Sequence, residues 1–169
     1  MSESIRSFLT IELSDEAGQF LDDIQIKLKR TGGDVRWIKP KNIHLTLKFL
    51  KEIEREKIDD VVTAVAESLK DIKSFEAQLS ELGVFPDMHR PRIIWAGLKD
   101  PAGEINHLVG KIELALQPLG FPKEDRDFQA HITLGRVRSL KNISQLIDAI
   151  KNLVLPAGPE ATDRLGDPL

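Results

Sequence analysis

The chain has 169 residues, with 41% hydrophobic and 30% charged side chains, which is ordinary for a globular protein of a single domain. It has no cysteine, so disulfides, thiolate metal sites and a cysteine nucleophile are excluded. A net charge of −3 also excludes a nucleic-acid partner held by bulk positive charge, so a nucleic acid would be contacted at a small local site such as a strand end.

Membrane targeting is not predicted either. The N-terminal residues lack the basic-then-apolar order of a signal peptide, and no apolar run approaches the roughly 18 residues of a membrane span. We therefore expect a cytoplasmic protein with no membrane partner.

The first part of the chain predicts a strand, a helix and a second strand. Residues 5–13 are rich in β-forming side chains and predict a strand. Ser14 provides a capping hydroxyl ahead of two acidic residues, and the helix that it begins ends at Gly32 and Gly33. Residues 35–38 predict a short extended piece, and 43–50 predict a strand.

The rest of the chain continues the alternation of helices and strands. Apolar residues with a period of 3.6 predict helices over 58–69, 105–119 and 143–153. Alternating or β-rich segments predict strands over 75–82, 92–98 and 128–137, with a proline-containing loop over 83–91. This order indicates a degenerate duplication and an α+β fold of antiparallel sheets covered by helices, with a single domain over 1–155 and an irregular tail over 156–169.

A short pattern occurs twice in the predicted strands. Each copy reads His, apolar, Thr, apolar, at residues 44–47 and 131–134. Successive strand side chains point to opposite faces, so His44 and Thr46 share one face, as do His131 and Thr133. From the composition about 0.02 such tetrads are expected by chance, so coincidence is a poor explanation for two copies.

Paired imidazoles and hydroxyls indicate acid–base chemistry on a phosphate. Histidine titrates near neutral pH, so one imidazole can remove a proton from the attacking group while a second donates one to the leaving group. Threonine hydroxyls donate hydrogen bonds to the non-bridging oxygens, where negative charge must be stabilised. The pattern predicts a phosphodiester site that uses neither a metal nor a cofactor.

The histidines also admit other interpretations. A single histidine on a half-buried strand is more often structural, and it is the duplication that favours a functional role. A zinc site needs a third ligand, and the sequence has neither His-x-His nor HExxH spacing, nor a serine-hydrolase motif. His89 lies in the proline-containing loop and His107 between apolar helix positions, so we expect both to be structural or surface residues.

With their flanking residues, the two motifs resemble those of the two-histidine (2H) phosphoesterases, in particular the RNA 2′,3′-cyclic phosphodiesterases, also called 2′-5′ RNA ligases. The resemblance spans about residues 4–138 and includes Trp37-Ile-Lys-Pro-Lys-Asn-Ile-His-Leu-Thr-Leu, Gly83-Val-Phe-Pro and Phe128-Gln-Ala-His-Ile-Thr-Leu-Gly-Arg. It implies a bilobal fold, in which two pseudo-symmetric lobes present the motifs to each other across a central cleft.

The resemblance implies roles for five residues. His44 and His131 match the catalytic pair, Thr46 and Thr133 match hydroxyls that orient the phosphate, and Arg136 matches an arginine that lies at the phosphate.

Strand alternation bears on two cationic residues beside the motifs. It places Arg136 on the face opposite His131, as a surface residue, unless Gly135 carries a β-bulge that re-aims it. It places Lys48 on the face of His44, where its positive charge would serve the substrate.

The chain departs from the family pattern in two places. Many relatives have Arg-Pro before the second histidine, where this chain has Gln129 and Ala130, so a phosphate or base contact of those relatives has no counterpart there. The C-terminal residues lack the apolar strand with which relatives usually close, which predicts an exposed sheet edge in the second lobe.

The resemblance implies metal-independent hydrolysis of a terminal 2′,3′-cyclic phosphate of RNA to a 2′-phosphate. We favour His131 as the base and His44 as the acid, and the reverse reaction would join RNA ends through a 2′-5′ bond. The alternatives are a binding module without turnover, or an enzyme that acts on small cyclic nucleotides or 2′-5′ linkages. We expect a monomer whose partners are RNA ends or small cyclic-phosphate nucleotides.

Overall fold

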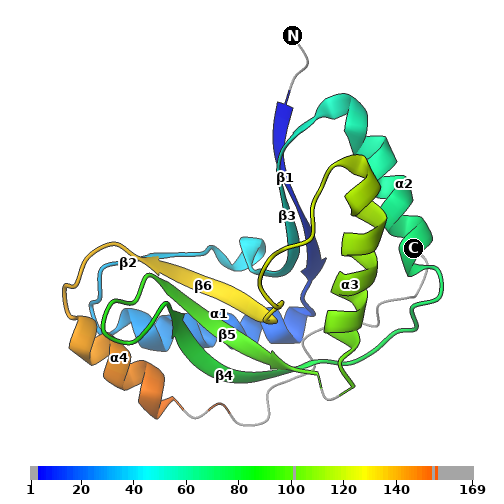
Figure 1. The fold of residues 1–169 in the computed structure, drawn as a ribbon. Helices are drawn as coiled ribbons and strands as arrows, with labels where there is room; N and C mark the ends of the chain where they lie inside the picture. The colour runs from blue at the N-terminus through cyan, green and yellow to red at the C-terminus, as the bar shows by residue number, and fades with distance from the viewer. Residues whose placement is uncertain (1–3, 101, 154, 156–169) are drawn as a thin grey trace.

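The computed structural model describes residues 4–100, 102–153 and 155, so the predicted tail of residues 156–169 lies outside the described residues. Strands and helices follow one another in the predicted order, and the α+β class is confirmed (Figure 1). The strands are β1 (Ser4–Glu12), β2 (Val35–Trp37), β3 (His44–Glu54), β4 (Gln78–Phe85), β5 (Ile93–Lys99) and β6 (His131–Val137). The α-helices are α1 (Asp15–Lys29), α2 (Ile58–Leu69), α3 (Glu104–Leu116) and α4 (Ile143–Asn152), and the 3-10 helices are η1 (Pro40–Asn42), η2 (Arg55–Lys57) and η3 (Gln117–Leu119).

Three strands have bounds that differ from the prediction by more than one residue: β3, which continues to Glu54 instead of ending at residue 50, β4 and β6. β4 begins at Gln78 and continues through Gly83, which was predicted to lie in a loop. Gly83 pairs with Trp95 of β5, and a Cβ atom there would lie 2.2 Å from the indole ring, so the ring fills the space that a side chain would need. β6 begins at His131 rather than at residue 128, because its pairing with β5 ends at Gly97 opposite His131.

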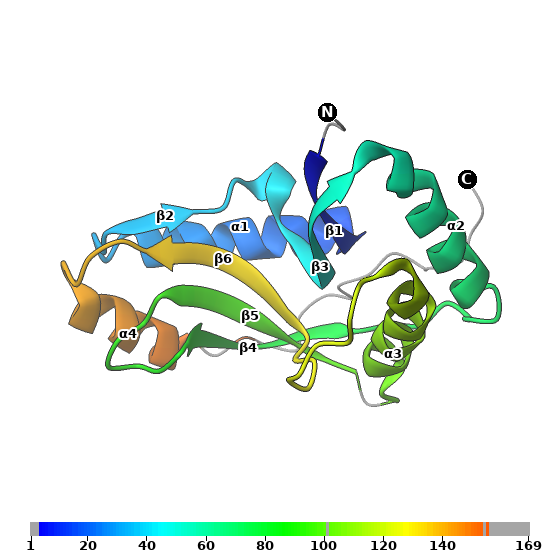
Figure 2. The same cartoon turned by 45° about the horizontal axis from the view of Figure 1, so that its top comes forward.

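The strands form one antiparallel sheet that has two lobes. Its order is β1-β3-β6-β5-β4, and β2 also pairs with β6. Extended ladders join β1 to β3 in the first lobe and β4, β5 and β6 in the second. Within the described residues, a single strand pair joins the two lobes of the sheet, Leu45 of β3 opposite Ile132 of β6. Figures 1 and 2 show the two lobes running in different directions on either side of this crossing.

Each lobe is backed by a helix that follows a strand of the other lobe. α1 follows β1 but lies along the second lobe beside β2 and β6, where α4 packs against it (Figure 2). α3 follows β5 but packs against α2 beside β1 and β3. This exchange of helices ties the two lobes together. Within the described residues, no helix combines the length and the apolar character needed to cross a lipid bilayer.

α1 illustrates how the sequence produces this packing. The Ser14 hydroxyl accepts a hydrogen bond from the backbone N–H of Ala17, as the capping pattern predicts. Leu21, Ile24 and Leu28 form the apolar stripe of the helix and are buried in the core. Burial of each such side chain stabilises the fold by about 1.5–3 kcal/mol, so the stripe fixes which face of α1 meets the sheet.

The contact between Gly83 and Trp95 predicts that Gly83→Ala destabilises the fold. The new methyl group must displace an indole ring within the sheet, and such overpacking typically lowers the free energy of unfolding by about 1–3 kcal/mol. Gly18→Ala on α1 is the matched control, because a Cβ at Gly18 meets no atom within 4 Å and alanine favours a helix by about 0.5–1 kcal/mol. Chemical denaturation measures both changes, and a Gly83→Ala protein as stable as the wild type would contradict the described packing.

Candidate active site

The crossing of β3 and β6 positions the two predicted motifs. Leu45 and Ile132, the residues that pair there, are both fully buried. Residues that face each other in an antiparallel pair point to the same side of the sheet, and their chain neighbours point to the other side. The histidine and the threonine of each motif therefore share the face opposite to the core, and all of them are partly exposed: His44, Thr46, His131 and Thr133.

The register also determines which of these residues are neighbours. One step along the antiparallel pair from Leu45 and Ile132 brings His44 opposite Thr133 and Thr46 opposite His131. On this register each imidazole shares a face of the sheet with the hydroxyl of the other motif as well as with that of its own. The structure thus brings together the four residues that the repeated pattern singles out.

Both motifs are followed by a β-bulge. In β3 the register with β1 shifts between Thr46 and Lys48, which leaves Leu47 without a partner residue in β1. In β6 the register with β5 shifts in the same way at Leu134. A bulge inserts one extra residue and so interrupts the alternation of faces. Predictions from strict alternation therefore fail for the residues directly after these two positions; in β3 a second register shift, at Leu50, restores the alternation.

The bulge in β6 places the Arg136 side chain on the same face of the sheet as His131 and Thr133. Arg136 lies opposite Ile93 and Thr133 lies opposite Trp95, and these two β5 residues are two positions apart and point to the same side. A bulge of the kind considered for Gly135 is present one residue earlier, at Leu134, and it turns the exposed Arg136 side chain to the side of Thr133. Gly135 itself is required by close packing, because a Cβ there would lie 2.6 Å from Val35.

The bulge in β3 has the opposite consequence for Lys48, which the structure does not place with the four motif residues. Lys48 is only 4% exposed, and its Nζ lies 3.4 Å from Glu113 Oε1 and donates to the carbonyl of Pro122 at 2.9 Å. Glu113 Oε1 also accepts the backbone N–H of Glu124. Strict alternation predicted that Lys48 points to the same face of the sheet as His44. The extra residue of the bulge turns Lys48 to the opposite face, which the helices cover.

The ring of His131 has a defined hydrogen bond. Its Nδ1 lies 2.7 Å from the carbonyl oxygen of Gln129. Because a carbonyl only accepts, Nδ1 must carry the proton, and Nε2 is the nitrogen that remains for chemistry. Phe85 meets the ring edge-on at 5.1 Å between centroids, and Trp95 lies 6.4 Å away. The ring is therefore oriented by one backbone contact and two aromatic side chains.

The ring of His44 stacks on an aromatic side chain that the sequence interpretation missed. Phe8 lies parallel to the imidazole, with 5.4 Å between centroids and 15° between planes. Phe49, which the bulge brings to the same face, is 6.2 Å from Phe8. Both phenylalanines are largely exposed, at 47% and 55%. A signal was present, since Phe8 stands between Arg6 and Thr10 on the polar side of its strand.

The other two histidines lie away from this site. His89 and His107 are exposed, as predicted for surface residues. Near His89, backbone N–H groups of Arg90 and His89 donate to the Asp87 carboxylate, and these hydrogen bonds lower the pKa of Asp87 below its usual value. Among the residues that the structure describes, no three His, Cys, Asp or Glu side chains gather as a metal site requires.

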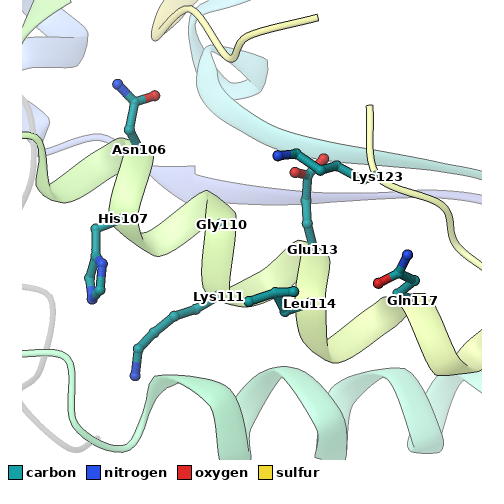
Figure 3. A pocket seen from close by; sticks show the side chains of 8 residues that line it. All are labelled: Asn106, His107, Gly110, Lys111, Glu113, Leu114, Gln117 and Lys123. Atoms are coloured by element: carbon teal, nitrogen blue, oxygen red, sulfur yellow. The ribbon is translucent and has the colours of Figure 1, made fainter. Parts of the chain in front are cut away.

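A cavity of about 410 Å³ lies along α3, away from the motifs (Figure 3). None of the four motif residues lines it; the lining residues are Asn106, His107, Gly110, Lys111, Glu113, Leu114, Gln117 and Lys123. The motif residues instead lie on the face of the sheet opposite to the core, where all four are partly exposed.

Comparisons with known proteins agree with this geometry. The family model described as LigT like phosphoesterase matches residues 11–95 and 97–161. The chain therefore belongs to the LigT-like phosphoesterase family, and the predicted family and the prediction of an enzyme are confirmed.

Relatives and solved structures extend this result. A protein from Methanothermobacter thermautotrophicus is 28% identical over 94% of this chain and 96% of its own length, and one from Archaeoglobus fulgidus is 32% identical over 79% and 73%. Both are named RNA 2′,3′-cyclic phosphodiesterase. The fold is shared with a Thermus thermophilus protein (TM-score 0.72, 24% identity, 95% of this chain and 82% of that one) and with Escherichia coli LigT complexed with 3′-AMP (TM-score 0.64, 23% identity, 92% and 80%).

The buried ion pair predicts that Lys48→Met weakens folding. Removal of one partner leaves the Glu113 carboxylate without its counter-charge, and breaking a buried pair in this way typically costs about 3–5 kcal/mol of the free energy of unfolding. The double variant Lys48→Met/Glu113→Leu removes both charges and should lose less. Denaturant titration measures all three proteins. Wild-type stability of Lys48→Met together with weaker phosphate binding would instead support the substrate role expected from alternation.

Proposed function

We propose that this protein hydrolyses the terminal 2′,3′-cyclic phosphate of RNA to a 2′-phosphate, without a metal or a cofactor, by acid–base catalysis from His44 and His131. The observation that carries the proposal is the crossing of β3 and β6, which gathers two imidazoles and two hydroxyls on one face. The relatives named RNA 2′,3′-cyclic phosphodiesterase support this substrate.

His131 is the base in this proposal. Its Nδ1 proton is engaged by the carbonyl of Gln129, so the lone pair of the neutral ring lies on Nε2 and can take a proton from the attacking water. His44 is the acid, which agrees with its stacking on Phe8, because the π face of an aromatic ring attracts a cationic partner.

The reaction then follows from these two roles. The water oxygen forms a bond to phosphorus as His131 takes the water proton. The bond from phosphorus to the 3′ oxygen breaks, and His44 gives its proton to that oxygen. The product carries a 2′-phosphate and a 3′-hydroxyl, and exchange of protons with solvent returns both histidines to their starting states.

Thr46, Thr133 and Arg136 stabilise the phosphate during this reaction. The two hydroxyls lie next to the imidazoles and donate to non-bridging oxygens, where negative charge increases in the transition state. Arg136 shares their side of the sheet, and a guanidinium can donate two parallel hydrogen bonds to such oxygens. Arg36 lies opposite Arg136 in β2 and adds positive charge at the same edge.

Phe8 and Phe49 provide a surface for the nucleobase of the terminal nucleotide. They are exposed aromatic rings beside His44, and stacking on an aromatic ring binds any base by about 1–3 kcal/mol without reading its identity. The proposed acid, phosphate contacts and base platform thus share one face of the sheet.

The reverse reaction is part of the proposal. By microscopic reversibility, the same two histidines can join a 2′,3′-cyclic end to a 5′-hydroxyl, which forms a 2′-5′ bond. Water is in large excess over RNA ends, so hydrolysis dominates in dilute solution.

His44→Ala and His131→Ala should each reduce kcat by about 10²–10⁴-fold, because each removes one proton transfer. The assay uses purified protein and RNA with a 2′,3′-cyclic phosphate end, and it identifies the position of the product phosphate. The exposed His107→Ala on α3 is the matched control and should retain full activity. EDTA should have no effect. Activity that EDTA abolishes and zinc restores, or substrate binding without product, would sink the mechanism.

Phe49→Ala should raise KM for the same RNA about tenfold or more, since one stacking contact is removed. The side chain is 55% exposed, so stability should change little. Leu114→Ala, at a 71% exposed apolar position on α3, is the control for loss of surface hydrophobicity. A parallel assay with a cyclic mononucleotide separates RNA from small substrates, and an unchanged KM in Phe49→Ala would remove the base platform from the proposal.

A further inference from the structure

Gln25 of α1 is fully buried, and it contacts both the strand that carries the second motif and the connection that leads into the first. Its Nε2 donates to the carbonyl of Ile38 at 2.9 Å and to the carbonyl of Leu134 at 2.8 Å. The backbone N–H of Ile38 also donates to the Leu134 carbonyl at 2.9 Å. One side-chain amide and one backbone N–H therefore converge on the same oxygen.

The two carbonyls that Gln25 contacts lie close in the chain to the two motifs. Leu134 is the bulge residue of β6, directly after Thr133 and two residues before Arg136. Ile38 directly follows β2 and lies in the connection that leads through η1 to His44. Gln25 thus joins the segment that leads into the first motif to the bulge that follows the second.

The orientation of the amide follows from its partners. Two carbonyl oxygens require donors, so the nitrogen and not the oxygen of Gln25 must face them. The Oε1 atom is buried and has no hydrogen-bond partner among the described residues. Burial of the unpaired Oε1 atom destabilises the fold. The favourable contribution of this side chain therefore comes from the two hydrogen bonds that its Nε2 donates.

The other lobe has a matching arrangement with different chemistry. The described chain buries only three polar or charged residues, namely Gln25, Lys48 and Glu113. Lys48 follows the bulge of β3, and Glu113 reaches it from α3, the helix that backs the first lobe. A helix thus supplies a buried polar group near each bulge: Gln25 contacts the carbonyl of the bulge residue itself, and Glu113 contacts the side chain of the lysine that follows the other bulge.

We propose that Gln25 is a positioning residue of the two-histidine site. It holds the bulge that turns Arg136 toward the phosphate, and it keeps this bulge at a set distance from the segment that carries His44. Gln25 itself touches neither substrate nor reacting atoms. The kinetic part of its test rests on the proposed function, whereas the backbone part does not.

The test compares Gln25→Met with the wild type. Methionine keeps the length of the side chain and removes both donors. A misplacement on the scale of an ångström typically costs about 10²-fold in rate, so kcat/KM should fall by up to about that factor. The loss should not add to that of Arg136→Ala, because the bulge contributes mainly through Arg136. In two-dimensional NMR spectra of the substrate-free protein, the amide signals of residues near 38 and 133–136 should change their chemical shifts.

Ile24→Val, a buried change on the same helix that touches neither carbonyl, is the control for general destabilisation. If Gln25→Met does not fold, Gln25→Glu carries the same readouts, since it keeps the shape and, when protonated, one donor. Losses in Gln25→Met and Ile24→Val that follow stability alone, full additivity with Arg136→Ala, or unshifted amides near Leu134 would overturn the proposal. A wild type without turnover would refute the proposed function, and the amide shifts would still decide the role of Gln25.

Discussion

The antiparallel contact between Leu45 and Ile132 is the constraint on which the site depends. It is the only residue pair that joins the two lobes of the sheet within the described chain, and both side chains are fully buried. Its geometry requires the histidine and threonine of each motif to point away from the core, into a common space. Either lobe alone carries one imidazole and one hydroxyl, which is no basis for two coordinated proton transfers. The crossing converts two half-sites into one.

The bulges and the exchanged helices stabilise this crossing from the core side. Each motif is followed by a bulge that breaks the strand ladder and leaves backbone groups to be satisfied elsewhere. α1 supplies Gln25 to one bulge, and α3 supplies Glu113 to the lysine that follows the other. A neutral amide on one side and an ion pair on the other make the two halves chemically unequal. The two histidines, whose proposed roles also differ, therefore have different buried polar groups behind their strands.

Much of the fold could be predicted from the sequence because its signals are local. Periodicity identified the helices, the capping hydroxyl located the start of α1, and the repeated motif located both site strands. The rules reached their limit at the bulges. Gly135 signalled a bulge near Arg136, so that face was anticipated, but Leu47 carries no such signal, and Lys48 was placed on the wrong side of β3. Phe8 and Gln25 were missed because their importance depends on partners distant in the chain.

That His44 and His131 act on one phosphate in opposite protonation states is tested most directly by the pH dependence of kcat/KM. The base must be unprotonated, so the rate rises as pH increases through its titration, and the acid must be protonated, so the rate falls at higher pH. The wild type should give a bell-shaped profile. The residual activity of His131→Ala should lose the rising limb, and that of His44→Ala should lose the falling limb. A full bell in both variants would contradict the assignment of these histidines as the acid–base pair.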